Sequence, residues 1–240
     1  MINYAHRGAS EYAPENTLSS FYLGLLQGAN GIETDVQRTK DGELVLFHDD
    51  TVDRVSDKSG NLWDFTLKEL KELKITGNSC TGFYDKIITF REFLEKFSEY
   101  EINFAIELKG PGVEKESLEL IKEFGVLERT TFTSFNYDYI KKIKELDSKA
   151  RVGWLVYEGD ETSVKKLLEI GGEEIAPKAE LITLENMKKW RKLNLGVRAW
   201  GVFNISLMKK MCDFKVDGMT VNFPDRLFDY MRREINEINL

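Results

Sequence analysis

Stretches with the period of a β-strand alternate along this chain with stretches that have the period of a helix. Predicted strands cover residues 2–5, 32–37, 44–47, 102–108, 131–134, 151–156, 174–176, 195–202 and 217–221. One predicted helix starts after Asn16 or Thr17 and ends before Gly28, and the others cover residues 67–73, 91–97, 116–124, 137–146, 164–170, 184–193, 207–212 and 225 onward. Strands that are each followed by a helix are typical of parallel pairing.

The number of parallel candidates is roughly the eight of a (β/α)₈ TIM barrel. The strand at 44–47 returns from a hairpin and is an extra strand outside that count. The chain contains no Pro-rich, Ser-rich or low-complexity linker and no fixed-period repeat. We therefore expect residues 1–240 to form a single barrel domain.

The hairpin contains the first concentration of reactive side chains. Asp41-Gly42 is a hairpin signal, and a turn centred there places Asp35 opposite His48. Glu33 lies two residues before Asp35 and so shares its face of the strand. One surface would then hold two carboxylates beside an imidazole. The alternative is the solvated face of an ordinary hairpin, which fits the apolar residues on the other face equally well.

Composition restricts the partners. The chain has 240 residues, 42% hydrophobic residues and a formal net charge of −7, with no basic run, which disfavours nucleic acid. It has no apolar stretch of the ~20 residues that span a bilayer and no leader-like start. Two cysteines, Cys80 and Cys212, fit a reducing compartment, so we expect a cytoplasmic protein. The oligomeric state stays open, a homo-oligomer included.

Other chemistry-bearing residues also fall at strand ends, which meet at one mouth in a barrel. They are His6 and Arg7 after the first strand, Glu107 and Lys109 after another, and Trp200 near the end of the chain. His6 and His48 are the only histidines in the sequence. A single histidine is more often a paired structural residue, but both of these lie at strand ends near acids.

Three of the predicted mouth residues are carboxylates. Glu33, Asp35 and Glu107 would repel one another at close range, and a divalent cation with oxygen ligands, Mg²⁺ or Ca²⁺, would relieve that repulsion. The alternative is that they pair with Arg7 and Lys109. Those two cations would otherwise suit a phosphate, so metal, cations and histidines together indicate phosphoryl transfer with an acid and a base.

Three motifs resemble the glycerophosphodiester phosphodiesterase family. They are HRGAS followed three residues later by PENT, GIETDVQRTKDG followed four residues later by FHD, and IELK. They occur in the family's order over nearly the full chain. The resemblance implies a (β/α)₈ barrel, with a small insertion at residues 50–88, that hydrolyses glycerophosphodiesters to glycerol 3-phosphate and an alcohol.

The resemblance also implies roles for individual residues. His6 and His48 are the acid and base, in an order that the sequence leaves open. Glu33, Asp35 and Glu107 bind the metal, Mg²⁺ or Ca²⁺ with Mn²⁺ as a third candidate. Substrate and phosphate binding fall to Arg7, Glu15, Lys109 and Trp200. The partner is a small glycerophosphodiester.

The sequence departs from the family pattern at two asparagines. One residue is inserted before Asn204 relative to the family's Trp-Thr-Val-Asn, and Asn222 stands near the position where the last strand often ends in Thr-Asp. Both leave the predicted constellation intact, and their roles stay open.

Other functions on the same barrel are also open. A lysophospholipase D, or a phospholipase that stops at the cyclic phosphate, would need an apolar groove for an acyl chain. Tyr12, Trp63, Phe65, Phe83 and Tyr84 are candidates for such a groove. A non-catalytic barrel that binds a phosphorylated ligand would be expected to have lost a histidine or a metal-binding acid. None is lost here. The head group and the metal are likewise left open.

Overall fold

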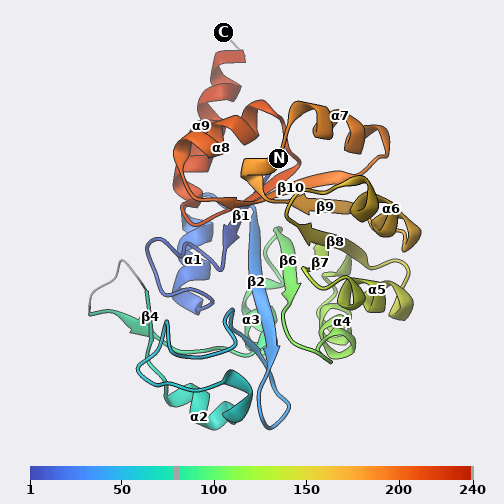
Figure 1. Cartoon of the computed structure of the whole chain (residues 1–240). Helices are drawn as coiled ribbons and strands as arrows, with labels where there is room; N and C mark the ends of the chain where they lie inside the picture. Colours follow the sequence, from blue (N-terminus) through green and yellow to red (C-terminus); the bar gives the residue numbers. More distant parts are fainter. Residues whose placement is uncertain (78–81, 239–240) are drawn as a thin grey trace.

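A closed barrel of parallel strands forms the centre of the molecule (Figure 1). The computed structural model describes residues 1–77 and 82–238, so Cys80 and the centre of the loop predicted at 77–82 lie outside it. Neighbouring strands follow the order β1-β11-β10-β9-β8-β7-β6-β2, and β1 pairs with β2 to close the ring. These barrel strands are β1 (Ile2–His6), β2 (Gly31–Arg38), β6 (Asn103–Leu108), β7 (Thr130–Ser134), β8 (Arg151–Val156), β9 (Glu174–Pro177), β10 (Gly196–Val202) and β11 (Gly218–Val221).

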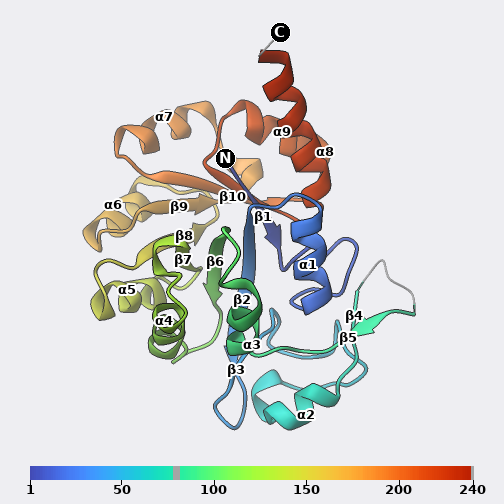
Figure 2. The ribbon, with the colours of Figure 1, turned by 180° about the vertical axis from the view of Figure 1, so that it is seen from behind.

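Helices surround the barrel on its outside (Figures 1 and 2). They are α1 (Leu18–Leu26), α3 (Phe90–Phe97), α4 (Glu114–Glu123), α5 (Tyr137–Leu146), α6 (Glu161–Glu169), α7 (Leu184–Lys192), α8 (Ile205–Asp213) and α9 (Pro224–Ile238). Short 3₁₀ turns cover Leu127–Arg129 and Ala179–Leu181. The predicted barrel is confirmed, and within the described residues no helix is both long enough and apolar enough to cross a bilayer.

The hairpin lies one residue away from the predicted register. Strand β3 (Leu44–Leu46) pairs antiparallel with β2 outside the ring, and its partners are Val36 with Leu46 and Gln37 with Val45. Phe47 therefore lies opposite Asp35 and donates its N–H to the Asp35 carbonyl at 3.0 Å. The expected pairing of Asp35 with His48 is wrong. The loop of residues 39–43 is centred on Asp41, not between Asp41 and Gly42, and this shifts the register of the hairpin by one residue.

The turn after β1 is held by close packing. An added Cβ at Gly8 would lie 2.4 Å from the backbone of Ser20 in α1, so only glycine lets the two elements approach this closely. Arg7 has φ 55°, a left-handed conformation that is uncommon outside glycine. Its N–H donates to the Glu33 carbonyl at 2.9 Å and its own carbonyl accepts from Asn16 at 3.0 Å. These bonds hold the strained residue at the mouth.

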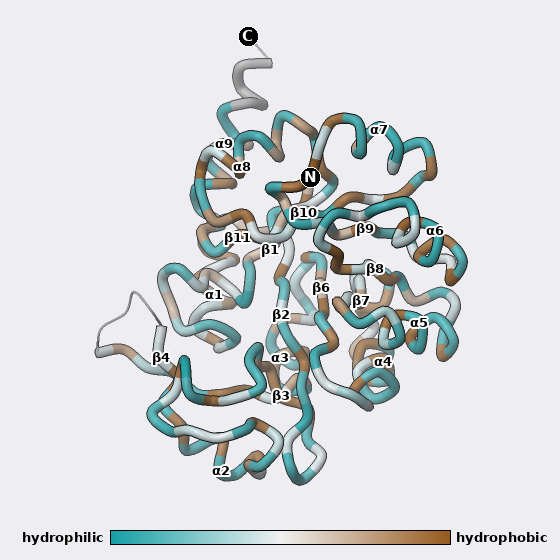
Figure 3. The backbone as a smooth tube through the Cα atoms, in the orientation of Figure 1, coloured by the Kyte–Doolittle hydropathy of each residue, from teal (hydrophilic) through white to brown (hydrophobic). Residues whose placement is uncertain are grey.

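The main hydrophobic core lies between the strands and the surrounding helices. Phe21 of α1, Phe93 and Phe97 of α3 and Phe104 of β6 are fully buried. Phe93 meets Phe21 and Phe104 edge to face, with ring centroids 4.9 and 5.8 Å apart. Brown hydrophobic positions alternate with teal ones along these elements in Figure 3, as expected when one face of each packs inward.

The segment between β3 and α3 has a smaller hydrophobic core of its own. It contains α2 (Leu67–Glu72), a turn of 3₁₀ helix (Leu62–Asp64) and the short pair β4 (Ile75–Thr76) and β5 (Tyr84–Asp85). Thr66 and Glu69 form the predicted capping box of α2. The buried side chains of this cluster are Val45, Phe47, Val52, Val55, Leu62, Leu70, Leu73, Ile75 and Ile87. Because Val45 and Phe47 belong to it, the segment is packed onto the end of the hairpin.

Candidate active site

Three buried carboxylates meet at the mouth of the barrel. Glu33 and Asp35 project from one face of β2, as predicted, and Glu107 projects from the adjacent β6, where it pairs in register with Asp35. One carboxylate oxygen of each lies within 4.8 Å of the others. The three residues are 4%, 0% and 7% exposed, so water screens their charges weakly.

The pKa values of these three carboxyl groups are shifted in opposite directions. Burial, and then the charge of Asp35, raise the pKa of both Glu33 and Glu107. Although burial opposes it, Arg7 and then Lys109 hold the pKa of Asp35 well below its usual range. One oxygen of Asp35, Oδ1, is buried without a hydrogen-bond partner, since Lys109 Nζ is 3.7 Å away. Three convergent carboxylates with an oxygen left over fit a divalent cation.

The cations predicted to bind phosphate lie on the edge of the same cluster. Arg7 Nε lies 3.2 Å from Asp35 Oδ2, and Lys109 Nζ lies 2.9 Å from Glu107 Oε1. Despite their burial, the neighbouring carboxylates, Asp35 first, raise the pKa of both Arg7 and Lys109. Both therefore stay charged. The two sequence hypotheses, cation pairing and a metal site, thus coexist in one arrangement.

His6 lies at the end of β1 beside Glu33. Its Nδ1 donates to Asn222 Oδ1 at 2.6 Å, and its Nε2 lies 3.9 Å from Glu33 Oε2. Burial and the charge of Arg7 lower the pKa of His6 to about 3, so the ring is neutral near pH 7. Asn222, whose role the sequence left open, therefore fixes which nitrogen of His6 faces the site.

His48 follows β3 on the other side of the cluster. Its Nδ1 donates to Asp49 Oδ1 at 2.5 Å. Although burial alone would raise it, hydrogen bonds from Arg54 and His48 lower the pKa of Asp49 to about 2. Gln37 Nε2 donates to the carbonyls of Phe47, His48 and Asp49 at 3.0, 3.1 and 2.8 Å. Backbone and side chain of His48 are thus both held in place.

Glu15 joins the barrel to the segment after β3. It accepts from Arg7 NH1 at 2.9 Å and from both terminal nitrogens of Arg54 at 2.8 and 2.7 Å. Arg54 also donates from Nε to Asp49 Oδ2 at 2.6 Å. A continuous chain of charged hydrogen bonds therefore runs from His48 through Arg54 to Arg7.

Sequence reasoning missed several residues of this network. Thr17 is the N-cap of α1, which frees Asn16 to donate to Asp35 Oδ2 at 3.0 Å and to accept from Thr34 at 2.8 Å. Asp49 and Arg54 were likewise not predicted. Asn16 lies within the PENT motif and Asp49 within FHD, so both residues belong to motifs that the sequence shows. The spacing of the motifs cannot show which residues Asn16 and Asp49 contact.

The remaining side of the mouth is aromatic. A cavity of about 140 Å³ is lined by His6, Arg7, Glu33, His48, Glu107, Phe135, Leu155, Arg198, Trp200, Gly201, Phe203 and Thr220. Trp200 donates from Nε1 to the Val156 carbonyl at 2.9 Å, so it lies on the wall of this cavity. Asn204 lies outside it and caps α8 by accepting from the Leu207 N–H at 2.9 Å.

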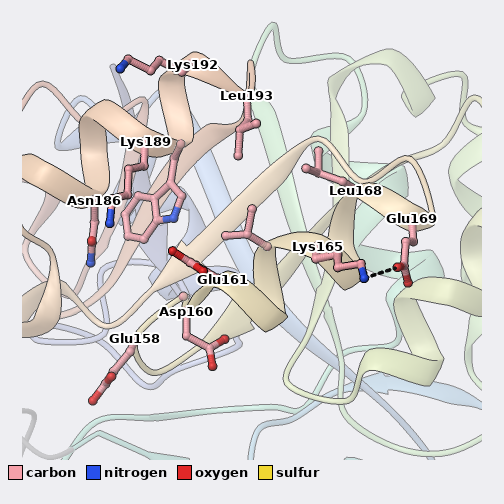
Figure 4. A pocket seen from close by; sticks show the side chains of 13 residues that line it. Glu158, Asp160, Glu161, Lys165, Leu168, Glu169, Asn186, Lys189, Lys192 and Leu193 are labelled. Atoms are coloured by element: carbon pink, nitrogen blue, oxygen red, sulfur yellow. Dashed lines mark ion pairs between the residues drawn. The ribbon is translucent and has the colours of Figure 1, made fainter.

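Within residues 1–77 and 82–238, two further cavities hold no comparable cluster of histidines and buried acids. A groove of about 930 Å³ lies between α6 and α7 on the outside of the barrel, and its lining combines Trp190 and Leu193 with exposed charged residues such as Lys165 and Glu169 (Figure 4). Trp63 lines a cavity of about 420 Å³ beside Lys109. Of the other residues expected in an acyl groove, Phe65 packs into the small core and Tyr12 donates to Asp225 at 3.0 Å.

The geometry of the mouth is suited to one kind of chemistry. Two histidines flank a cluster that can hold a divalent cation, and Arg7 and Lys109 add fixed positive charge beside it. Such an arrangement can neutralise an anionic phosphoryl group while one imidazole takes a proton and the other delivers one.

Known proteins share this sequence pattern. Residues 6–226 match the glycerophosphoryl diester phosphodiesterase family. A glycerophosphodiester phosphodiesterase from Caldanaerobacter subterraneus is 32% identical over 237 residues, which cover 95% of this chain and 97% of that protein.

Solved structures share the fold. A phosphodiesterase from Oleispira antarctica, in complex with the product sn-glycerol-3-phosphate, is 27% identical with a TM-score of 0.86, and the match covers 95% of this chain and 96% of that one. A glycerophosphodiester phosphodiesterase from Thermotoga maritima is 26% identical with a TM-score of 0.80, over 96% and 98% of the two chains.

Proposed function

This chain belongs to the glycerophosphoryl diester phosphodiesterase family, a family of enzymes that hydrolyse glycerophosphodiesters, and from that premise we propose how its own residues carry out the reaction. The products are glycerol 3-phosphate and the free alcohol. His6 and His48 are the catalytic acid and base. The observation that supports this most directly is that both histidines line the same cavity as Glu33 and Glu107.

Glu33, Asp35 and Glu107, which each offer one oxygen within 4.8 Å of the others, would hold a divalent cation. When bound, it would supply positive charge to the phosphate. All three ligands would be oxygens, which favours Mg²⁺ or Ca²⁺, with Mn²⁺ as a third candidate. Asn16 orients Asp35 through the hydrogen bond at 3.0 Å.

Arg7 and Lys109 bind the phosphate oxygens. Arg7 is held by Glu15 and Asp35, so its fork is already oriented before the substrate arrives, and little side-chain entropy is lost on binding. Lys109 adds a point charge from the opposite side of Asp35. Trp200 forms part of the substrate-binding wall.

The two histidines divide the proton transfers. His6 Nδ1 donates to Asn222, which leaves Nε2 without a proton, so Nε2 takes the proton from a glycerol hydroxyl as that oxygen attacks phosphorus. His48, whose Nδ1 is bonded to the Asp49 carboxylate, gives a proton to the departing alcohol oxygen. Water then opens the resulting cyclic phosphate, with the two roles reversed.

The test is release of phosphate esters from a panel of glycerophosphodiesters, with Mg²⁺, Ca²⁺, Mn²⁺ or chelator. We expect glycerol 3-phosphate with a metal and none in chelator. A cyclic phosphate that accumulates instead would identify a phospholipase that stops after the first step. Binding of glycerol 3-phosphate without turnover of any ester would identify a non-catalytic barrel.

A further inference from the structure

Part of the reaction cavity is made of carbon surface. Phe135, Leu155, Trp200 and Phe203 line it together with the histidines and the acidic residues. Phe135 follows β7, Leu155 lies near the end of β8, and the other two lie at the end of β10. These residues come from the ends of β7, β8 and β10, on the side of the mouth away from the charged network of Glu15 and Arg54.

Tyr157 extends this surface, which we call the aromatic wall: Phe135, Tyr157, Trp200 and Phe203. The Trp200 ring centroid lies 5.2 Å from that of Phe135 and 5.5 Å from that of Tyr157, with near-perpendicular planes. Phe135, Phe203 and Tyr157 are 41%, 62% and 65% exposed. Large aromatic rings left this open to water at a reaction cavity are available to contact a ligand.

Apart from the Tyr157 hydroxyl, the aromatic wall offers little to a hydroxyl group. Trp200 Nε1 already donates to the Val156 carbonyl, and the nearby Thr220 hydroxyl points to the Ala199 carbonyl at 3.4 Å. A polyol placed here would replace few of the hydrogen bonds that it makes to water. The glycerol end of the substrate therefore fits on the polar side of the cavity, which leaves the wall for the alcohol that departs.

A methylated cation gains most from such a surface. Its methyl groups bury apolar area, and its charge is attracted to aromatic rings. Two cations lie nearby, and each is paired with a carboxylate. Lys178, whose stem lies beside Gly201, pairs with Glu180 at 2.7 Å. Arg198, which lines the cavity, pairs with Glu174 at 2.8 Å. The net charge of −7 also favours cations over the molecule as a whole.

We propose that the aromatic wall is the subsite for the leaving alcohol and that it selects a head group with a methylated ammonium, of the choline type. This inference rests on the proposed function, since it specifies which glycerophosphodiesters the enzyme prefers. Trp200 is held rigidly by its hydrogen bond, whereas Tyr157 and Phe203 are the exposed contacts that set the preference.

The experiment compares four esters of glycerol 3-phosphate with saturating metal: choline, its neutral carbon isostere 3,3-dimethylbutanol, ethanolamine and glycerol. We expect kcat/KM for the choline ester to exceed that for the glycerol ester by about tenfold or more, with the two others between them. Tyr157→Ala and Phe203→Ala should each narrow the choline-to-glycerol ratio by about 3- to 10-fold, mainly through KM. Tyr157→Phe should keep the wild-type ratio.

Tyr100→Ala is the matched control, because Tyr100 is an equally exposed aromatic residue, 45%, that precedes β6 at the opposite end of the strands. It should leave the ratio unchanged. Equal kcat/KM for the choline and glycerol esters would overturn the proposed subsite. So would a decrease in kcat/KM by the same factor for every ester in Tyr157→Ala and Phe203→Ala. Faster turnover of lysophosphatidylcholine than of the choline ester, lost in the wall variants, would assign the wall to an acyl chain instead. No glycerol 3-phosphate from any ester would refute the proposed function, and the subsite would fall with it.

Discussion

At the residue scale, the two histidines differ in the group that binds Nδ1. His6 donates to the neutral amide of Asn222, whereas His48 donates to the charged carboxylate of Asp49. Each acceptor fixes the tautomer and the orientation of its ring, but the amide is neutral and the carboxylate is charged. The same side chain is therefore placed in two different electrostatic environments.

Removing either imidazole tests the assignment. His6→Ala and His48→Ala should each lower kcat by at least ~10²-fold, the lower end of what a positioned acid or base contributes. The readout is steady-state turnover of a glycerophosphodiester at saturating metal. Near-wild-type turnover in either variant would show that the histidine concerned has a structural role only.

Arg7 is predicted to act through its fork rather than its charge alone. Arg7→Lys keeps the charge but cannot reproduce bidentate contact with phosphate while still bonded to Glu15, so we expect kcat/KM to fall about tenfold or more. Lys68→Arg on the surface of α2 is the control for a basic exchange and should behave as wild type. If kcat/KM in Arg7→Lys equals that of wild type, Arg7 forms a structural ion pair with Glu15 and Asp35.

At the scale of elements, Arg54 links the segment after β3 to the residues at the barrel mouth. Arg54 bonds Asp49 on one side and Glu15 on the other, so the same guanidinium supports His48 and Arg7. The end of β3 is also held by Gln37 from β2. His48 and Arg7, which come from two different elements, thus share one support.

Loss of the Asp49 carboxylate should misplace His48 without disturbing substrate binding. For Asp49→Asn we expect kcat to fall about 10- to 100-fold with little change in KM, because the imidazole ring loses the carboxylate that orients it. Asp49→Glu should recover part of the loss. Asp50→Asn removes the next carboxylate along the chain, which is exposed, and serves as the control. A change confined to KM or to melting temperature would argue against orientation of His48.

At the scale of the whole molecule, the mouth of the barrel is the place where function opposes stability. Three carboxylates from neighbouring strands are buried together, and their pKa values are displaced in opposite directions. The raised pKa of Glu107 means that the folded chain holds a proton which the unfolded chain releases above pH ~4.3. Without metal, stability should therefore decline as the pH rises from that value through the raised pKa.

A metal ion that binds only the folded chain should reverse this decline. At a hundredfold excess over Kd it contributes about 2.7 kcal/mol, which corresponds to a rise in Tm of roughly 5–10 °C. We expect chelator to lower Tm and abolish activity together, and Mg²⁺ or Ca²⁺ to restore both. Calorimetry or a dye-based melt between pH 5 and 8, with and without metal, measures the effect.

Glu107→Gln separates repulsion from metal binding. It should lose most of the metal-dependent rise in Tm and should melt above wild type in chelator near pH 8, because one buried charge is gone. The difference should shrink toward pH 5, where wild-type Glu107 is protonated. Identical melting curves with and without saturating metal, alongside full activity in chelator, would exclude the three-carboxylate metal site.

The order of elements follows from the sequence because it depends on local patterning. Three of these patterns depend only on residues a few positions apart: the apolar period, the capping box at Thr66 and Glu69, and the helix end at Gly28. Each lies where predicted. The carboxyl ends of parallel strands lie at one edge of a barrel. The sequence alone therefore predicts that His6, Glu33 and Glu107 share one mouth.

The fine pairing at that mouth was decided only by tertiary structure. The hairpin register depends on how the loop at 39–43 closes, and a shift of one residue places Phe47 instead of His48 opposite Asp35. Asn222, the partner of His6, is placed by packing between elements far apart in the chain. Asp49, the partner of His48, is placed by the bend after β3. Sequence determined which chemical groups reach the barrel mouth, because strand direction is local. Tertiary structure determined which group touches which, because side-chain contacts over a few ångströms depend on every element that packs around them.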